Sequence, residues 1–180
     1  MSENIEKFKK FEELNKPDIR HLLCNQVFAY KVTLESLYAD VSAESITSNA
    51  PEEIISNFNI LKNLVVYSWF CYSFQQIAHH QSYIIIEHAL RIKACAKDKS
   101  PGLKKLISSA IENEWINDSG FRHINEDMLN SADNTEYCKQ LVVSLPKLRN
   151  CNAHGSNSLW PFPVMSLRIC ADLINQLFKE

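Results

Sequence analysis

The segment from Leu148 to Gly155, LRNCNAHG, concentrates side chains that can bind an anion and exchange a proton. The guanidinium of Arg149 is a permanent cation, and its planar fork of donors suits a phosphate group. The imidazole of His154 can exchange a proton, and the amide of Asn150 both donates and accepts hydrogen bonds. Together these groups could cleave RNA without a metal ion, because the reaction needs a proton transfer and stabilisation of charge on phosphorus.

The spacing of these residues predicts that they end a helix. If the helix runs to about Ala153, then Asn150 and His154 stand at positions i and i+4 and share one face. Gly155 follows directly and can take the left-handed conformation that terminates helices. A purely structural alternative stays open at this point, since Arg and His side chains at a helix C-terminus also complement the unpaired carbonyl groups.

The order Arg149-Asn150-x-x-x-His154 resembles the signature of HEPN domains (higher eukaryotes and prokaryotes nucleotide-binding), in which an Arg with a polar neighbour precedes a His. The upstream stretch SYIIIEHALRIKA, residues 82–94, also resembles a long helix of that family. The resemblance covers about Tyr67–Phe178. It implies an antiparallel helical bundle that forms a homodimer and places the two motif helices along one cleft.

The same resemblance implies a function. Many members of the family are metal-independent endoribonucleases, often toxins paired with an antitoxin protein or antiviral effectors, while others only bind nucleotides, RNA or proteins. Carried over to this chain, it implies that Arg149 and His154 are catalytic and that Asn150 supports them. Pro146 departs from the expected pattern, because a proline three residues before Arg149 would bend the motif helix.

Charged and aromatic residues around the motif give a second group of predictions. Glu87 pairs with Arg91 at i, i+4 and is a supporting residue if it faces the motif. Trp160 could stack on a base, or it could staple the last helix to the bundle. A basic cluster either contacts RNA phosphates or forms a solvated face; it comprises Arg91, Lys93, Lys97, Lys104 and Lys105.

The hydrophobic pattern predicts an all-α protein, an up-and-down bundle of five to seven helices, because no segment shows sustained alternation of period two. We expect residues 1–60 to form an N-terminal helical extension packed on a HEPN-like bundle of residues 61–180. The helices predicted from periodicity and proline positions are Pro17–Ala39, one short and one or two long helices between Pro51 and Ala96, Pro101–Glu114, a helix from Tyr137 that Pro146 kinks or restarts, and Pro163–Phe178.

Composition excludes several classes of protein. Three glycines are too few for a glycine-rich phosphate loop, and a net charge of -2 gives no global attraction to nucleic acid or membrane. The charged first ten residues lack the apolar stretch of a secretory signal, which indicates a cytoplasmic protein without a membrane span. The spacing of His79, His80 and His88 matches no familiar zinc site, so we expect neither a metal nor another cofactor.

Three hypotheses follow from the sequence. The chain is an RNA-cleaving dimer, a dimer that holds RNA, a nucleotide or a protein without cleaving, or a helical bundle whose motif only stabilises the assembly. The first hypothesis expects Arg149 and His154 in an open shared cleft. The third expects both side chains to be paired and covered.

Overall fold

The computed structural model describes residues 6–27, 31–96, 101–124, 134–153 and 163–179, and every regular element within these ranges is helical. This confirms the all-α class predicted from the sequence. Two short 3-10 helices, Phe11–Glu13 and Asp118–Gly120, accompany the longer helices. The α-helices are α1 (Ile19–Val27), α2 (Leu34–Ala43), α3 (Glu52–Tyr67), α4 (Phe74–Lys93), α5 (Leu103–Glu112), α6 (Glu136–Ala153) and α7 (Pro163–Leu177).

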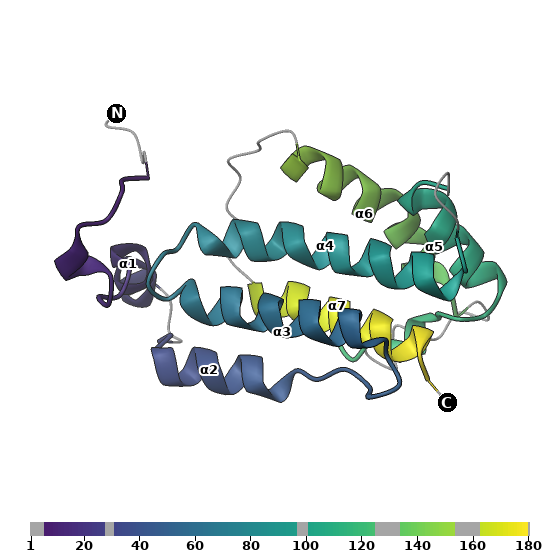
Figure 1. The fold of residues 1–180 in the computed structure, drawn as a ribbon, viewed down its shortest axis with the longest axis horizontal. Coiled ribbons are helices and arrows are strands. Elements are labelled where there is room, and N and C mark those ends of the chain that lie inside the picture. Colours follow the sequence, from purple (N-terminus) through teal and green to yellow (C-terminus); the bar gives the residue numbers. More distant parts are fainter. Residues whose placement is uncertain (1–5, 28–30, 97–100, 125–133, 154–162, 180) are drawn as a thin grey trace.

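Helix α4 lies at the centre of the bundle. It runs antiparallel to α3, and α7 lies along both of them (Figure 1). Helix α2 flanks α3 and α7, while α5 and α6 pack on each other and on α4. Helix α6 runs in the opposite direction to α4, so its C-terminal turns return toward the middle of the central helix (Figure 1).

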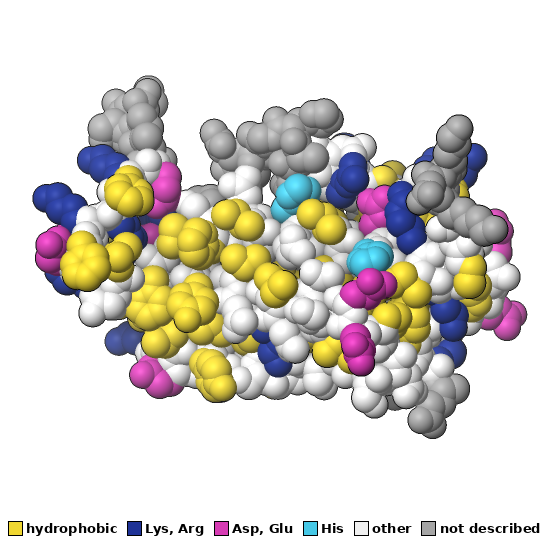
Figure 2. Space-filling view, in the orientation of Figure 1, with side chains coloured by type: hydrophobic (Ala, Val, Ile, Leu, Met, Phe, Trp, Pro, Cys, Tyr) yellow, Lys and Arg dark blue, Asp and Glu magenta, His cyan; other side chains and the backbone are white. Residues whose placement is uncertain are grey.

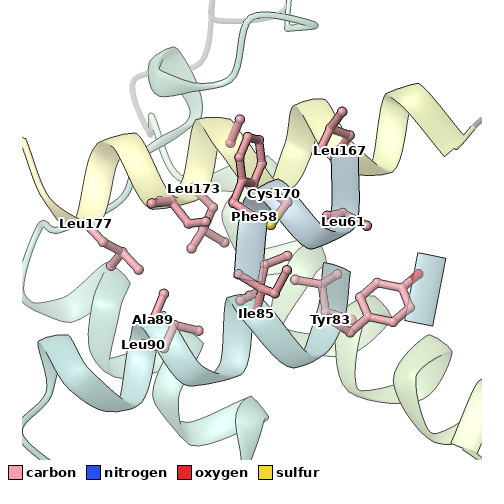
Figure 3. Close-up of a cluster of buried hydrophobic side chains, with 14 of the residues drawn as sticks. Phe58, Leu61, Tyr83, Ile85, Ala89, Leu90, Leu167, Cys170, Leu173 and Leu177 are labelled. Atoms are coloured by element: carbon pink, nitrogen blue, oxygen red, sulfur yellow. The ribbon is translucent and has the colours of Figure 1, made fainter. Parts of the chain in front are cut away.

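The hydrophobic core lies between α3, α4 and α7 (Figure 3). Its largest side chains come from all three helices, with Phe58 on α3, Ile85 and Leu90 on α4, and Leu167 and Leu173 on α7. Ten of the fifteen residues of α7 are buried, so this helix is covered on most of its circumference. None of the helices in the described ranges is long and apolar enough to cross a membrane.

The single helix predicted for Pro17–Ala39 is wrong, because the chain divides there into α1 and α2. Thr33 caps α2: its hydroxyl accepts from the Ser36 amide, and the Ser36 hydroxyl accepts from the Thr33 amide. Such a reciprocal cap satisfies amides at a helix start and so favours a new helix at this point. The side chain of Asn25 also bonds both backbone groups of Val32, which holds the connection between the two helices.

A buried carboxylate attaches α1 to the turn between α3 and α4. Asp18 is 5% exposed, and it accepts hydrogen bonds from the Arg20 side chain and from the Tyr72 amide. Burial alone raises the pKa of this carboxyl group, but the hydrogen bonds from Arg20 and Tyr72 outweigh burial and hold the pKa well below its usual range. The N-terminal part of the chain is therefore fixed to the bundle by a charged group.

Helix α6 continues through Pro146 instead of restarting there. Proline has no amide hydrogen, so the carbonyl group of Val142 lacks its usual partner within the helix. Arg149 and Asn150 both lie between Pro146 and the end of the helix at Ala153. The last turns of α6 thus follow an interruption in its hydrogen-bond ladder.

A network of two buried carboxylates and two partly exposed arginines joins three distant segments of the chain. Glu44, at the C-terminal end of α2, is 1% exposed and pairs with Arg122 at 2.5 Å and with Arg168 of α7 at 2.8 Å. Arg122 also pairs with Asp172 of α7 at 2.5 Å. Next to this network, the side chain of Asn175 accepts from the Thr47 amide. These contacts fix the connection between α2 and α3 against α7.

Candidate functional site

Glu87 of α4 lies between two arginines from two different helices. One carboxylate oxygen contacts Arg91 Nη2 at 2.6 Å, and the other lies 3.4 Å from Arg149 Nη2 on α6. Arg149 Nη1 also donates to the Asn150 side-chain oxygen at 3.3 Å. The structure therefore brings together four residues that the sequence singled out. We refer to Glu87, Arg91, Arg149 and Asn150 as the Glu87 cluster.

The helices explain why these side chains meet. Glu87 and Arg91 are one turn apart on α4 and share a face. Helix α6 packs on α4, and its last turns carry Arg149 and Asn150 toward that face. Figure 2 shows basic side chains beside acidic ones on the upper right of the molecule, in the region where Figure 1 shows α6 alongside the C-terminal half of α4.

The two contacts of Glu87 differ in strength. The bond to Arg91 has the length of a strong charge-assisted hydrogen bond, whereas the 3.4 Å separation from Arg149 is much longer than the usual 2.7–2.9 Å. The Arg149 side chain is also slightly more exposed than that of Arg91, at 40% compared with 34%. Of the two guanidinium groups, Arg149 is therefore the one that is more available to an anion from solution.

The charges of the cluster favour such an anion. Two guanidinium groups stand around one carboxylate, so a positive charge is left over. A guanidinium has five N–H donors, and it binds phosphate oxygens in a bidentate manner. Asn150 is exposed beside it and can donate from its amide nitrogen. This arrangement suits the binding of one phosphate group at Arg149.

Three of the predicted site residues lie outside the described residues. These are His154, directly after the end of α6, and Lys97 and Trp160. Their roles stay predictions, as does the left-handed conformation proposed for Gly155.

The predicted basic cluster is divided among different contacts. Arg91 pairs with Glu87, and the Lys93 ammonium lies over the Trp115 ring at 5.7 Å from its centroid. Lys104 and Lys105 are exposed in the first turn of α5, and neither forms an ion pair with any residue that the structure describes. These two lysines are the members of the cluster that are most available to a polyanion.

Sequence reasoning missed a second feature on the same helices. His79 and Tyr83 of α4 and Ser166 of α7 are buried, and the imidazole of His79 is hydrogen-bonded to both the Tyr83 and the Ser166 hydroxyl groups. From the sequence, the only role considered for His79 is that of a metal ligand. Within the described ranges, no group of three His, Cys, Asp or Glu side chains is placed to hold a metal ion. The i, i+4 spacing of His79 and Tyr83 on an apolar helix face was the available signal for a buried polar pair.

Comparisons with known proteins gave no match: no protein-family model, curated protein or solved structure is significantly similar to the chain.

Proposed function

We propose that the chain is a HEPN-type endoribonuclease that cleaves single-stranded RNA without a metal ion and acts as a homodimer. The observation that supports this most is the state of Arg149, which is half exposed, loosely held by Glu87, and next to an exposed Asn150. A structural arginine would instead be covered and tightly paired. The identity of the family rests on the motif resemblance.

In the proposed reaction, Arg149 binds the scissile phosphate and stabilises the charge that builds on its oxygens in the transition state. The ribose 2′-oxygen loses its proton and attacks phosphorus, the bond from phosphorus to the 5′-oxygen breaks, and that oxygen takes up a proton. His154 moves one of these protons, as base or as acid. Asn150 orients Arg149 or the substrate, and Glu87 positions the Arg149 side chain.

This reaction makes a direct prediction for the purified protein. Incubation with single-stranded RNA should give one product that ends in a 2′,3′-cyclic phosphate and one with a 5′-hydroxyl group, and EDTA should not change the rate. Mass spectrometry of the fragments identifies both ends. Intact RNA after incubation with varied sequences would rule out the endoribonuclease.

A second function, RNA, nucleotide or protein binding without cleavage, is favoured by one observation. The Glu87 carboxylate lies 3.4 Å from Arg149 and offsets part of its charge, which leaves less of that charge to stabilise a transition state. A gel-shift assay on the same RNAs separates the two proposals, because a binding module retards the RNA and releases it intact.

The homodimer has a candidate surface on α3 and α4. Large apolar side chains are exposed there, at Ile60 and Tyr67 of α3 and at Ile77 and Ile84 of α4. Figure 2 shows hydrophobic side chains across this face with few charges among them. Ile77, Ile84 and Arg91 follow one another at intervals of seven on α4, so this apolar stripe leads along one face of the helix to a member of the Glu87 cluster.

Light scattering at tens of micromolar should therefore give twice the 20.7 kDa mass of one chain. Ile84→Asp should shift the protein to monomer, because a buried carboxylate at the interface is desolvated without a partner. Tyr38→Asp, an exposed apolar residue on α2, is the matched control and should stay dimeric. A clean monomer for the unmodified protein would contradict the proposed dimer.

A further inference from the structure

A pocket of about 260 Å³ lies between α4, α6 and α7, beside the Glu87 cluster. Its floor is buried and its rim is exposed, since Gln140, Leu148 and Met165 all reach solvent. The lining residues are His79, Ser82, Tyr83 and Ile86 of α4, Tyr137, Gln140, Leu141, Ser144 and Leu148 of α6, and Met165, Ser166 and Ile169 of α7.

The floor of the pocket is polar and uncharged. His79 Nδ1 lies 2.6 Å from the Ser166 hydroxyl oxygen, and its Nε2 lies 2.6 Å from the Tyr83 hydroxyl oxygen. Burial, helped by the neighbouring His80, lowers the pKa of His79 to about 4, so the imidazole is neutral at physiological pH. Burial also holds the pKa of Tyr83 well above its usual range, so its hydroxyl keeps its proton.

These hydroxyl groups retain hydrogen-bonding capacity. A hydroxyl has one donor and two acceptor positions, and the contact with His79 uses only one of them on Tyr83 and one on Ser166. The neutral imidazole needs a donor on one side and an acceptor on the other, which fixes the two hydroxyl groups in complementary roles. The floor can therefore offer both an acceptor and a donor to a bound molecule.

The walls are mostly apolar. Aliphatic side chains from all three helices face the space, among them Ile86, Leu141 and Ile169. Two aromatic rings, Tyr83 and Tyr137, also line it, and aromatic side chains favour stacked or edge-to-face contacts with another ring. A charged ligand would lose its hydration here without a counter-charge, which is costly. The volume of about 260 Å³ lies just below the usual range for small-molecule sites, roughly 300–1,000 Å³, so the pocket suits a ligand no larger than a small ring.

We propose that this pocket binds an uncharged, planar heteroaromatic ring, with its polar edge hydrogen-bonded to the Tyr83 and Ser166 hydroxyl groups. The ring can belong to a free small molecule or to a base of an RNA strand. The second source rests on the proposed function. Ile86 and Leu148, which line the pocket, immediately precede Glu87 and Arg149 in the sequence, so the pocket and the Glu87 cluster lie on neighbouring parts of α4 and α6.

The first test is direct binding to the full chain, measured by isothermal titration calorimetry with adenine, uracil, indole and benzoate. The three neutral rings should include at least one binder with a Kd of about 1 mM or tighter, which is modest for a ligand of this size. Benzoate, a ring of similar size with a charge, should bind at least tenfold more weakly. No binding by any neutral ring at several millimolar, or tighter binding of benzoate, would overturn the proposal.

Two variants locate the binding. Ser144→Phe puts a ring into the pocket from its half-exposed wall and should weaken binding at least tenfold, whereas Ser108→Phe on α5 is the matched control and should bind normally. Tyr83→Phe removes one hydroxyl group and should weaken binding about three- to tenfold, the usual value of one hydrogen bond. Thermal melting confirms that each variant is folded. Unchanged binding by Ser144→Phe would place the ligand elsewhere and overturn the proposal.

A binding experiment with RNA distinguishes the two sources of the ring, and it does not depend on cleavage. If a base enters the pocket, Ser144→Phe weakens binding of a short single-stranded RNA, and the neutral ring competes with that RNA. If the neutral ring binds, but neither Ser144→Phe nor competition by the ring changes RNA binding, then the site takes a free small molecule. Both results support the pocket, and ring binding without any RNA cleavage would leave the pocket standing while the proposed endoribonuclease fails.

Discussion

His154→Ala and Arg149→Ala should each lower the rate of RNA cleavage by roughly two to four orders of magnitude. Loss of a proton-transfer group costs about 10²–10⁴ in rate, and loss of one donor to the transition-state charge costs about 10²–10³. Arg149→Lys should recover only part of the rate, because an ammonium keeps the charge but loses the bidentate fork. The measurement is the initial rate of cleavage of a labelled single-stranded RNA under single-turnover conditions.

Lys147→Ala is the matched control for these variants. Lys147 is an exposed basic residue on the same helix, two positions before Arg149, and its removal changes the net charge by the same amount as Arg149→Ala. It should cleave at close to the normal rate. Circular dichroism and light scattering should show that all variants keep the fold and the assembly state. Equal cleavage by His154→Ala and the unmodified protein would disprove the catalytic assignment.

Arg122→Met should lower the free energy of unfolding by about 3 kcal/mol, at the lower end of the effect of breaking a buried ion pair. The guanidinium contacts both Glu44, which is 1% exposed, and Asp172, which is 3% exposed. Its loss leaves Asp172 without this cation and Glu44 with Arg168 alone. We expect the lower end of this energy range because Arg122 itself is half exposed, so that water partly screens its charge. Urea unfolding followed by circular dichroism measures the change.

Arg168→Met provides the comparison, since it removes one cation from Glu44 but leaves Arg122 in contact with both carboxylates. Its effect should be clearly smaller than that of Arg122→Met. Equal effects, or a loss below about 1 kcal/mol for Arg122→Met, would show that the network behaves as a set of exposed surface pairs.

The helices with a continuous apolar stripe were predictable from the sequence. The last helix was predicted from Pro163 to Phe178 and is found from Pro163 to Leu177, because its apolar spacing and the proline at its start agree. The end of α6 at Ala153 was also predicted. The division between α1 and α2 was not, because the Thr33–Ser36 cap lies within a run of helix-compatible residues that shows no glycine or proline.

The contacts of the candidate site depend on tertiary structure that a single sequence does not specify. Spacing on α4 predicted the pair of Glu87 and Arg91, and this pair is present. The contact between Glu87 and Arg149 depends on how α6 crosses α4, which periodicity does not give. The pocket is a still harder case, because it requires three helices to meet around His79, which on a local pattern was only one of several histidines.

The position of α7 has a consequence for how the chain folds during synthesis. This helix fills the core between α3 and α4, and it holds the α2–α3 connection through contacts that span 124 residues for Glu44 and Arg168 and 128 for Thr47 and Asn175. A nascent chain therefore cannot close its core until residues 163–177 have left the ribosome. Until then the inner faces of α3 and α4 stay in water, and such apolar surface on an incomplete chain promotes aggregation and attracts chaperones. Completion of the fold is thus delayed because the contacting residues are far apart in the sequence, although helices themselves are stabilised by local contacts.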